Sequence, residues 1–189
     1  FVSTNGGLTW TQKNTGLEKH DVFSLGQASD GSIVAGTRHG IYRLNGDLWS
    51  KVDRVSLTLP MPEPPPAPAK PVPAKRKGTA AKTAIAKTAP VKKPAKPVEK
   101  PFDGTVYAFT RDGDMMFAAT SDGVLKSTDS GQSWTLTANP EGHQWYSIAS
   151  SKSTIFTASL TKAAITNDGG QTWSGINPPS DLTHITSVA

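Results

Sequence analysis

The sequence contains no cysteine among its 189 residues. Disulfide bonds, thiolate metal ligands and cysteine nucleophiles are therefore excluded. Long apolar runs are missing too: none approaches the roughly 20 residues that a membrane-spanning helix needs, so we expect no transmembrane segment. Hydrophobic residues make up only 35% of the chain, which indicates that part of the chain, but not all of it, folds around a core.

Signatures of catalysis and of cofactor binding are equally scarce. The sequence has neither the Gly-x-Ser-x-Gly turn of a hydrolase nor a phosphate-binding loop. Its histidines do not show the spacing of metal ligands. They are His20, His39, His143 and His184. We therefore name no catalytic residue and expect neither a metal nor a cofactor.

One segment differs sharply in composition from the rest. Residues 60–100 hold eleven of the 15 prolines and ten of the 20 Lys and Arg residues, but no aromatic residue. Such a segment cannot offset its ordering entropy by burial, so we predict a disordered basic insert at 58–101 between two patterned parts, 1–57 and 102–189. Two roles stay open: a flexible spacer, or an arm that binds anionic polymers or lipids weakly and in a salt-sensitive way. Without aromatic residues for base stacking, the insert is not a specific nucleic-acid module.

The patterned parts contain one eight-residue turn three times. It reads STNGGLTW (3–10, box 1), STDSGQSW (127–134, box 2) and TNDGGQTW (166–173, box 3). All three fit [Ser/Thr]-x-[Asp/Asn]-x-Gly-x-[Ser/Thr]-Trp. Tryptophans recur at a spacing of 39 residues, from Trp10 to Trp49 and again from Trp134 to Trp173. A period near 40 residues indicates a repeat protein.

Each repeat unit also contains short apolar runs joined by tight turns. Runs such as SIVAGT and MMFAAT suit strands that are covered on both faces, and the Asp-Gly pairs at 30–31 and 112–113 favour hairpins. Four short strands every 40 residues or so are typical of a β-propeller blade. We therefore predict an all-β fold of four-stranded antiparallel blades. The chain would supply a partial propeller of about 3.5 to 4 blades, cut from a parent with six or seven.

The boxes resemble the Asp-box, or BNR repeat, of β-propellers. Similar repeats occur in the sortilin/Vps10 ectodomain, in sialidases and in the photosystem II assembly factor family with its bacterial relatives. The stretch AATSDGVLKSTDSGQSW, 118–134, is most similar to the last group. The resemblance covers the chain outside the insert. It implies that each box closes the turn between the third and fourth strands of a blade, away from any catalytic centre, and it says little about activity.

The residue types of each box suit a structural turn. The Asp or Asn can accept backbone hydrogen bonds, the Gly can adopt a positive φ, and the Trp can fill space between blades. A calcium site would need six to eight oxygen ligands, and one carboxylate per box is too few. The residues assigned to these turns are Ser3, Asn5, Gly7, Trp10, Ser127, Asp129, Gly131, Trp134, Thr166, Asp168, Gly170 and Trp173.

Function has to be sought outside the boxes. His143, Gln144 and Trp145 precede a first strand and form a candidate binding loop, although Trp145 could instead pack inside the strand. We expect a non-enzymatic scaffold or binding module for a protein or polymer partner, from a larger exported or assembly-factor-like bacterial protein. The alternative is part of a sialidase-type glycoside hydrolase whose catalytic residues lie mainly outside this chain. We expect an extracytoplasmic location, periplasmic or secreted.

Overall fold

The computed structural model describes residues 1–57, 102–138, 144–179 and 185–188. Over these ranges the chain is all-β, with 13 strands and no helix, which confirms the predicted fold class. None of the described residues belongs to a helix that could cross a membrane. The predicted basic insert lies outside the described residues.

The first sheet is an antiparallel meander in sequence order. Its strands are β1 (Val22–Gln27), β2 (Ile33–Thr37), β3 (Gly40–Asn45) and β4 (Leu48–Lys51). β2 reads Ile-Val-Ala-Gly-Thr and is buried over most of its length, as the continuous apolar run predicts for a strand that is covered on both faces. The turn between β1 and β2 contains the predicted Asp-Gly pair, and Gly31 adopts a φ of 83° there.

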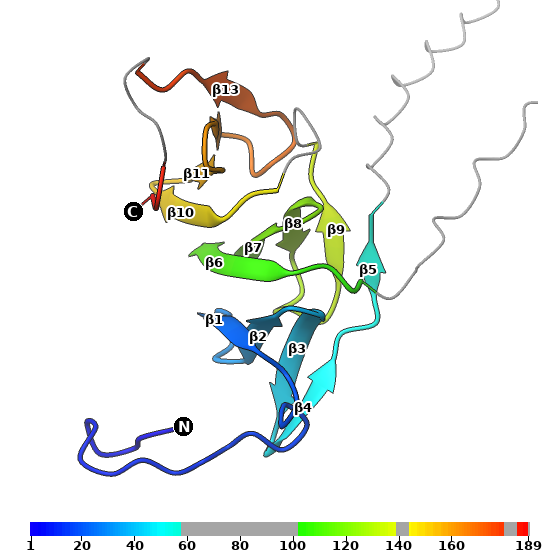
Figure 1. The fold of residues 1–189 in the computed structure, drawn as a ribbon, viewed down its shortest axis with the longest axis vertical. Helices are drawn as coiled ribbons and strands as arrows, with labels where there is room; N and C mark the ends of the chain where they lie inside the picture. The colour runs from blue at the N-terminus through cyan, green and yellow to red at the C-terminus, as the bar shows by residue number, and fades with distance from the viewer. Residues whose placement is uncertain (58–101, 139–143, 180–184, 189) are drawn as a thin grey trace, which may run out of the picture. The chain divides into compact units, whose positions relative to one another are not determined.

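Two further sheets repeat this arrangement (Figure 1). The second contains β6 (Val106–Asp112), β7 (Met115–Thr120), β8 (Gly123–Ser127) and β9 (Trp134–Leu136). The third contains β10 (Ser147–Ser151), β11 (Thr154–Ala158), β12 (Ala163–Thr166) and β13 (Ser174–Ile176). Each sheet is therefore the four-stranded blade that the 40-residue period predicts.

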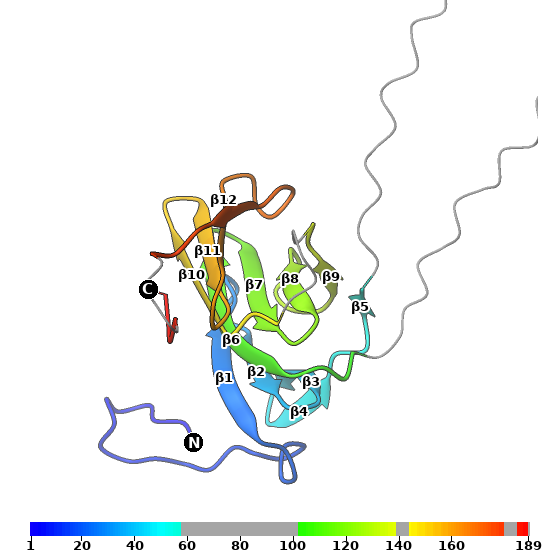
Figure 2. The same cartoon turned by 45° about the horizontal axis from the view of Figure 1, so that its top comes forward.

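The second sheet carries a fifth strand that the sequence did not predict. β5 (Val55–Ser56) pairs in parallel with β9, and both views show the two strands next to each other (Figures 1 and 2). The backbone N–H of Trp134 also donates to the Arg54 carbonyl, at 2.9 Å. A strand of two residues has too little pattern to be read from a sequence, so only the pairing reveals it.

Neighbouring sheets share apolar cores. The first and second sheets meet in a cluster that includes Val34 and Ile41 on one side and Val106 and Trp134 on the other. A second cluster joins residues of the second and third sheets, among them Phe117 and Trp145, which are at most 2% exposed. The first strands of the three sheets, β1, β6 and β10, contact one another in that order.

Both ends of the insert are anchored in the same core. Val55, three residues before the insert, and Phe102, directly after it, are each 1% exposed and belong to the cluster between the first and second sheets. Lys51 and Asp103 form an ion pair at 2.8 Å close to this point. The flanks of the insert are thus fixed by packing that does not involve the insert itself.

Residues 1–16 form a hairpin-like lead into the first sheet. Val2 and Thr11 form an isolated antiparallel bridge around box 1. The backbone N–H of Trp49 donates to the Thr15 carbonyl at 2.8 Å, and its indole N–H donates to the Lys13 carbonyl at 3.0 Å. Trp49 belongs to the unit that lacks a complete box, and it still anchors the lead to β4.

Candidate functional site

Box 2 is held by short hydrogen bonds around Ser127 and Asp129. The Ser127 hydroxyl donates to Asp129 Oδ1 at 2.8 Å and accepts from the Gly131 N–H at 2.9 Å. Asp129 also accepts from the backbone N–H and the hydroxyl of Ser133, at 2.9 and 2.6 Å. The Trp134 indole N–H donates to the Gly131 carbonyl at 3.2 Å. All of these bonds lie within eight residues, so the local sequence is enough to specify them.

Boxes 1 and 3 contain the same arrangement. In box 3 the Thr166 hydroxyl donates to Asp168 at 2.7 Å, and Thr172 donates to Asp168 from its backbone N–H at 2.9 Å. In box 1, Asn5 accepts from the Thr9 N–H at 3.0 Å, but its amide donates to the Thr9 hydroxyl at 2.9 Å. That one bond runs in the opposite direction from its counterparts in boxes 2 and 3. A neutral amide therefore closes the same turn.

Hydrogen bonds stabilise the ionised form of both box aspartates. Those donated by Thr172, first from its hydroxyl and then from its N–H, lower the pKa of Asp168 to about 2. Partial burial acts to raise the pKa of Asp129, but the hydrogen bonds donated by Ser133 outweigh it and the pKa is lowered. A general acid at neutral pH needs a raised pKa. The two carboxylates are thus set up as hydrogen-bond acceptors.

Boxes 2 and 3 also pack against the preceding sheet. Trp134 is 1% exposed in the core shared with the first sheet. Trp173 is 9% exposed and donates its indole N–H to Thr137 of the second sheet at 3.2 Å. Trp10 of box 1 is 62% exposed. The neighbouring sheet, and not the box, decides whether the tryptophan is buried.

A basic side chain from the preceding sheet reaches each of these two boxes. Arg43 on β3 donates to the Ser130 carbonyl at 3.2 Å, and Lys126 on β8 donates to the Gly169 carbonyl at 2.9 Å. Ser130 and Gly169 hold the same place in their boxes and have φ values of 58° and 67°. The sequence analysis missed these contacts. The available signal was that Arg43 and Lys126 occupy equivalent positions in aligned third strands.

An aromatic row crosses the first strands of the three sheets. It consists of Phe23 on β1, Tyr107 on β6 and Tyr146, which directly precedes β10. The ring centroids of Phe23 and Tyr107 are 6.4 Å apart, and those of Tyr107 and Tyr146 are 4.7 Å apart. Phe23 is 47% exposed, and the two tyrosines are half-buried. We call these three residues the aromatic row.

Backbone irregularities place two of the three rings. The pairing of β1 with β2 skips Phe23, and the pairing of β6 with β7 skips Tyr107. Both residues are therefore the extra residue of a β-bulge, which turns a side chain out of the regular alternation. Because the bulge recurs at the same position of two blades, it brings the two aromatic rings into one line.

Polar side chains flank the row at both ends. The Arg38 guanidinium lies 5.7 Å from the Phe23 ring centroid. At the other end, the Tyr146 hydroxyl donates to Gln144 Oε1 at 2.7 Å. Gln144 of the candidate binding loop thus adjoins the row, whereas His143 lies outside the described residues. Trp145 is 2% exposed and packs in the core between the second and third sheets.

The row and the boxes lie at opposite ends of the sheets. The row lies where the first strands begin, and the boxes follow the third strands. First and third strands run in the same direction because both are antiparallel to the second. The sequence analysis missed the row, although its signal is present: the second residue of VFSLG, of VYAFT and of WYSIA is aromatic.

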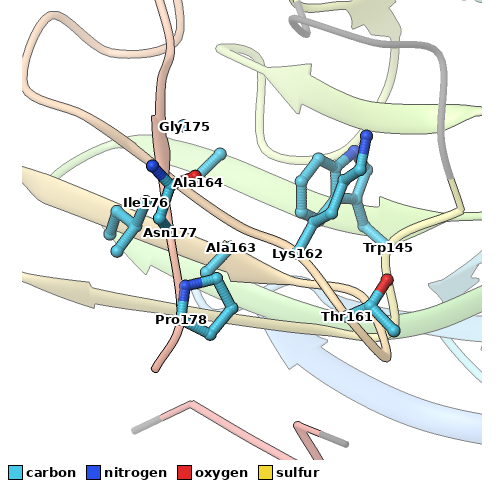
Figure 3. Close-up of a pocket in the computed structure, with 9 residues that line it drawn as sticks. All are labelled: Trp145, Thr161, Lys162, Ala163, Ala164, Gly175, Ile176, Asn177 and Pro178. Carbon is cyan, nitrogen blue, oxygen red and sulfur yellow. The ribbon is translucent and has the colours of Figure 1, made fainter. Parts of the chain in front are cut away.

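A pocket of about 360 Å³ adjoins the third sheet (Figure 3). Figure 3 shows Trp145 on the side opposite Ile176 and Pro178. The Trp145 indole N–H is buried without a hydrogen-bond partner. Beside the corresponding turn of the first sheet, the carbonyl of Phe102 lies where a Cβ on Gly40 would be, 2.6 Å from that point. We therefore interpret the pocket as a packing gap beside a blade, separate from the aromatic row. Across the residues that the structure describes, no three His, Asp or Glu side chains gather to hold a metal ion.

Comparison with known proteins supports the fold. No family model and no curated protein matches the sequence. The structure is similar to the extracellular domain of the one-component system BT4673 from B. thetaiotaomicron, with a TM-score of 0.53 and 10% identity over 88% of this chain and 17% of that one. It is also similar to the extracellular domain of the hybrid two-component system BT3049 from the same organism, with a TM-score of 0.54 and 14% identity over 94% of this chain and 22% of that one. At these identities the likeness shows a β-propeller fold and nothing about activity.

Proposed function

We propose that this chain is part of a β-propeller that acts as a non-enzymatic binding module, with a protein or polymer ligand held on the aromatic row. The row itself carries the proposal. Three aromatic side chains from three sheets form one line, and bulges that often adjoin functional sites place two of them. Phe23 stays 47% exposed, so the row is not fully used by the core. Tyrosine and arginine are also among the residues that contribute most to binding at protein interfaces.

The boxes have a different role in this proposal. They are Asp-box turns of the kind found in sortilin-type, sialidase-type and photosystem II assembly factor propellers, and they hold blades together. The Asp129 and Asp168 carboxylates are engaged by hydrogen bonds from their own turns. Arg43 and Lys126 add contacts between sheets. Substitutions in a box should therefore change stability and leave ligand affinity unchanged.

The proposal also covers organisation and location. The two patterned parts, 1–57 and 102–189, would contribute blades to one larger propeller, and 58–101 would be a basic spacer inserted between them. We propose an extracytoplasmic location, periplasmic or secreted, because the similar solved structures are described as extracellular domains.

An array of oligosaccharides and peptides, probed with the full chain, tests this function. We expect at least one ligand whose binding is lost in Tyr107→Ala and kept in Trp10→Ala, since Trp10 is an exposed aromatic residue outside the row. If no ligand depends on the row, the proposal is wrong. Turnover of aryl glycosides that an acidic-residue substitution abolishes would instead support a glycoside hydrolase.

A further inference from the structure

Hydrogen-bond donors outnumber free acceptors along the aromatic row. Within the described part of the chain, the Tyr107 hydroxyl has no hydrogen-bond partner, and Gln144 uses only its Oε1, which accepts from Tyr146 at 2.7 Å. The Gln144 amide N–H groups therefore remain available. A ligand that matches the row should present acceptors and few donors.

The charges beside the row are balanced. Arg38 lies over the Phe23 ring, and its Nε pairs with Asp21 at 3.4 Å. The side chains of Arg38 and Asp21 are 59% and 71% exposed, so both charges remain well hydrated. Nothing in this arrangement requires a charged ligand. The row offers apolar ring surface with neutral donors at its centre and at its Gln144 end.

We propose that the aromatic row binds a polyproline II segment of another polypeptide. This inference rests on the proposed function and names its ligand class. Proline has no N–H, and the carbonyls of a polyproline II helix have no internal hydrogen bonds. Such a segment therefore presents acceptors without donors, which is the complement of the row. It is also ordered before it binds, so the entropic cost of binding is small.

The dimensions agree with this ligand. The centroid separations of 6.4 and 4.7 Å make the row slightly longer than one polyproline II turn, about 9 Å. Pyrrolidine rings would pack against Phe23 and Tyr107, while the Tyr107 hydroxyl and the Gln144 amide donate to carbonyls. Carbohydrate hydroxyls, in contrast, are donors as well as acceptors, and the row has few free acceptors for them.

Fluorescence anisotropy of a labelled oligoproline peptide, roughly 12 residues or four turns long, tests the proposal on the full chain. Tyr107→Phe removes one donor and keeps the ring, so we expect affinity to fall roughly 2- to 10-fold, the equivalent of one hydrogen bond. Phe23→Ala removes an exposed ring and should weaken binding at least as much. Trp10→Ala, a control at an exposed tryptophan outside the row, should bind as the wild type does.

The outcomes separate this inference from the proposed function. Row-dependent oligoproline binding, with no binding of a Gly/Ser peptide of equal length, supports both. If oligoproline does not bind, or binds equally well to Phe23→Ala and Tyr107→Phe, the ligand class is wrong. If an oligosaccharide or a proline-free peptide then shows row-dependent binding, the binding module stands with another ligand. If nothing depends on the row, both are wrong.

Discussion

Replacing Asp129 by alanine tests the physical account of the box most directly. The substitution removes three acceptor contacts, with the Ser127 hydroxyl at 2.8 Å and with the N–H and hydroxyl of Ser133 at 2.9 and 2.6 Å. It adds no steric clash, because alanine is smaller than aspartate. Ser127 is only 2% exposed, so its hydroxyl loses its acceptor in a place that water reaches poorly.

The expected cost follows from these contacts. Leaving a buried hydroxyl without a partner costs about 1–3 kcal/mol. The bonds from Ser133 lie closer to solvent and contribute less because water replaces them in the variant. We therefore expect Asp129→Ala to lower the free energy of unfolding by about 2–3 kcal/mol. Asp129→Asn should cost less than about 1 kcal/mol, because Asn5 closes box 1 with the same geometry and one reversed hydrogen bond.

Equilibrium unfolding in urea measures the effect. Both variants should keep the wild-type slope, since the surface exposed on unfolding is unchanged, and only the midpoint should move. The reasoning is refuted if Asp129→Ala unfolds at the wild-type midpoint. It is also refuted if the asparagine variant is as unstable as the alanine variant, because then charge and not the hydrogen-bond geometry holds the turn.

Three further predictions use the same fold. Trp134→Ala should cost roughly 3–5 kcal/mol in a urea titration, whereas Trp10→Ala should cost under about 1 kcal/mol, because the rings are 1% and 62% exposed; equal costs would contradict the burial argument. Thr137→Val should cost about 1–2 kcal/mol, since the Trp173 indole N–H loses its acceptor at 3.2 Å; an unchanged midpoint would contradict that contact. The pKa of Asp168 is lowered to about 2, so its contribution to stability is complete above the unfolded value of about 3.9 and is lost as the pH falls toward 2. Asp168→Asn should therefore lose less stability than the wild type between about pH 4 and pH 2, as acid titrations followed by circular dichroism would show.

Within the candidate site, the sequence predicts what is local. The boxes could be named from eight residues each, because their hydrogen bonds connect residues at most four positions apart, such as Asp129 and Ser133. Gln144 could be named as part of a loop, but not its contact with Tyr146. The bulge at Phe23 leaves no signature of its own in the sequence, because it depends on how β1 pairs with β2.

The sequence alone determined that this protein consists of β-propeller blades. The 39-residue tryptophan spacing and the alternation of short apolar runs with turns are properties of one repeat, and one repeat is enough to form a four-stranded sheet. Only the tertiary structure decided what happens between repeats. Arg43 reaches Ser130 across 87 residues of sequence, Trp134 is buried while Trp10 is exposed, and three aromatic rings meet in one row. Those contacts follow from the packing of one blade against the next, and the free energy of that packing depends on surfaces that lie far apart in the chain.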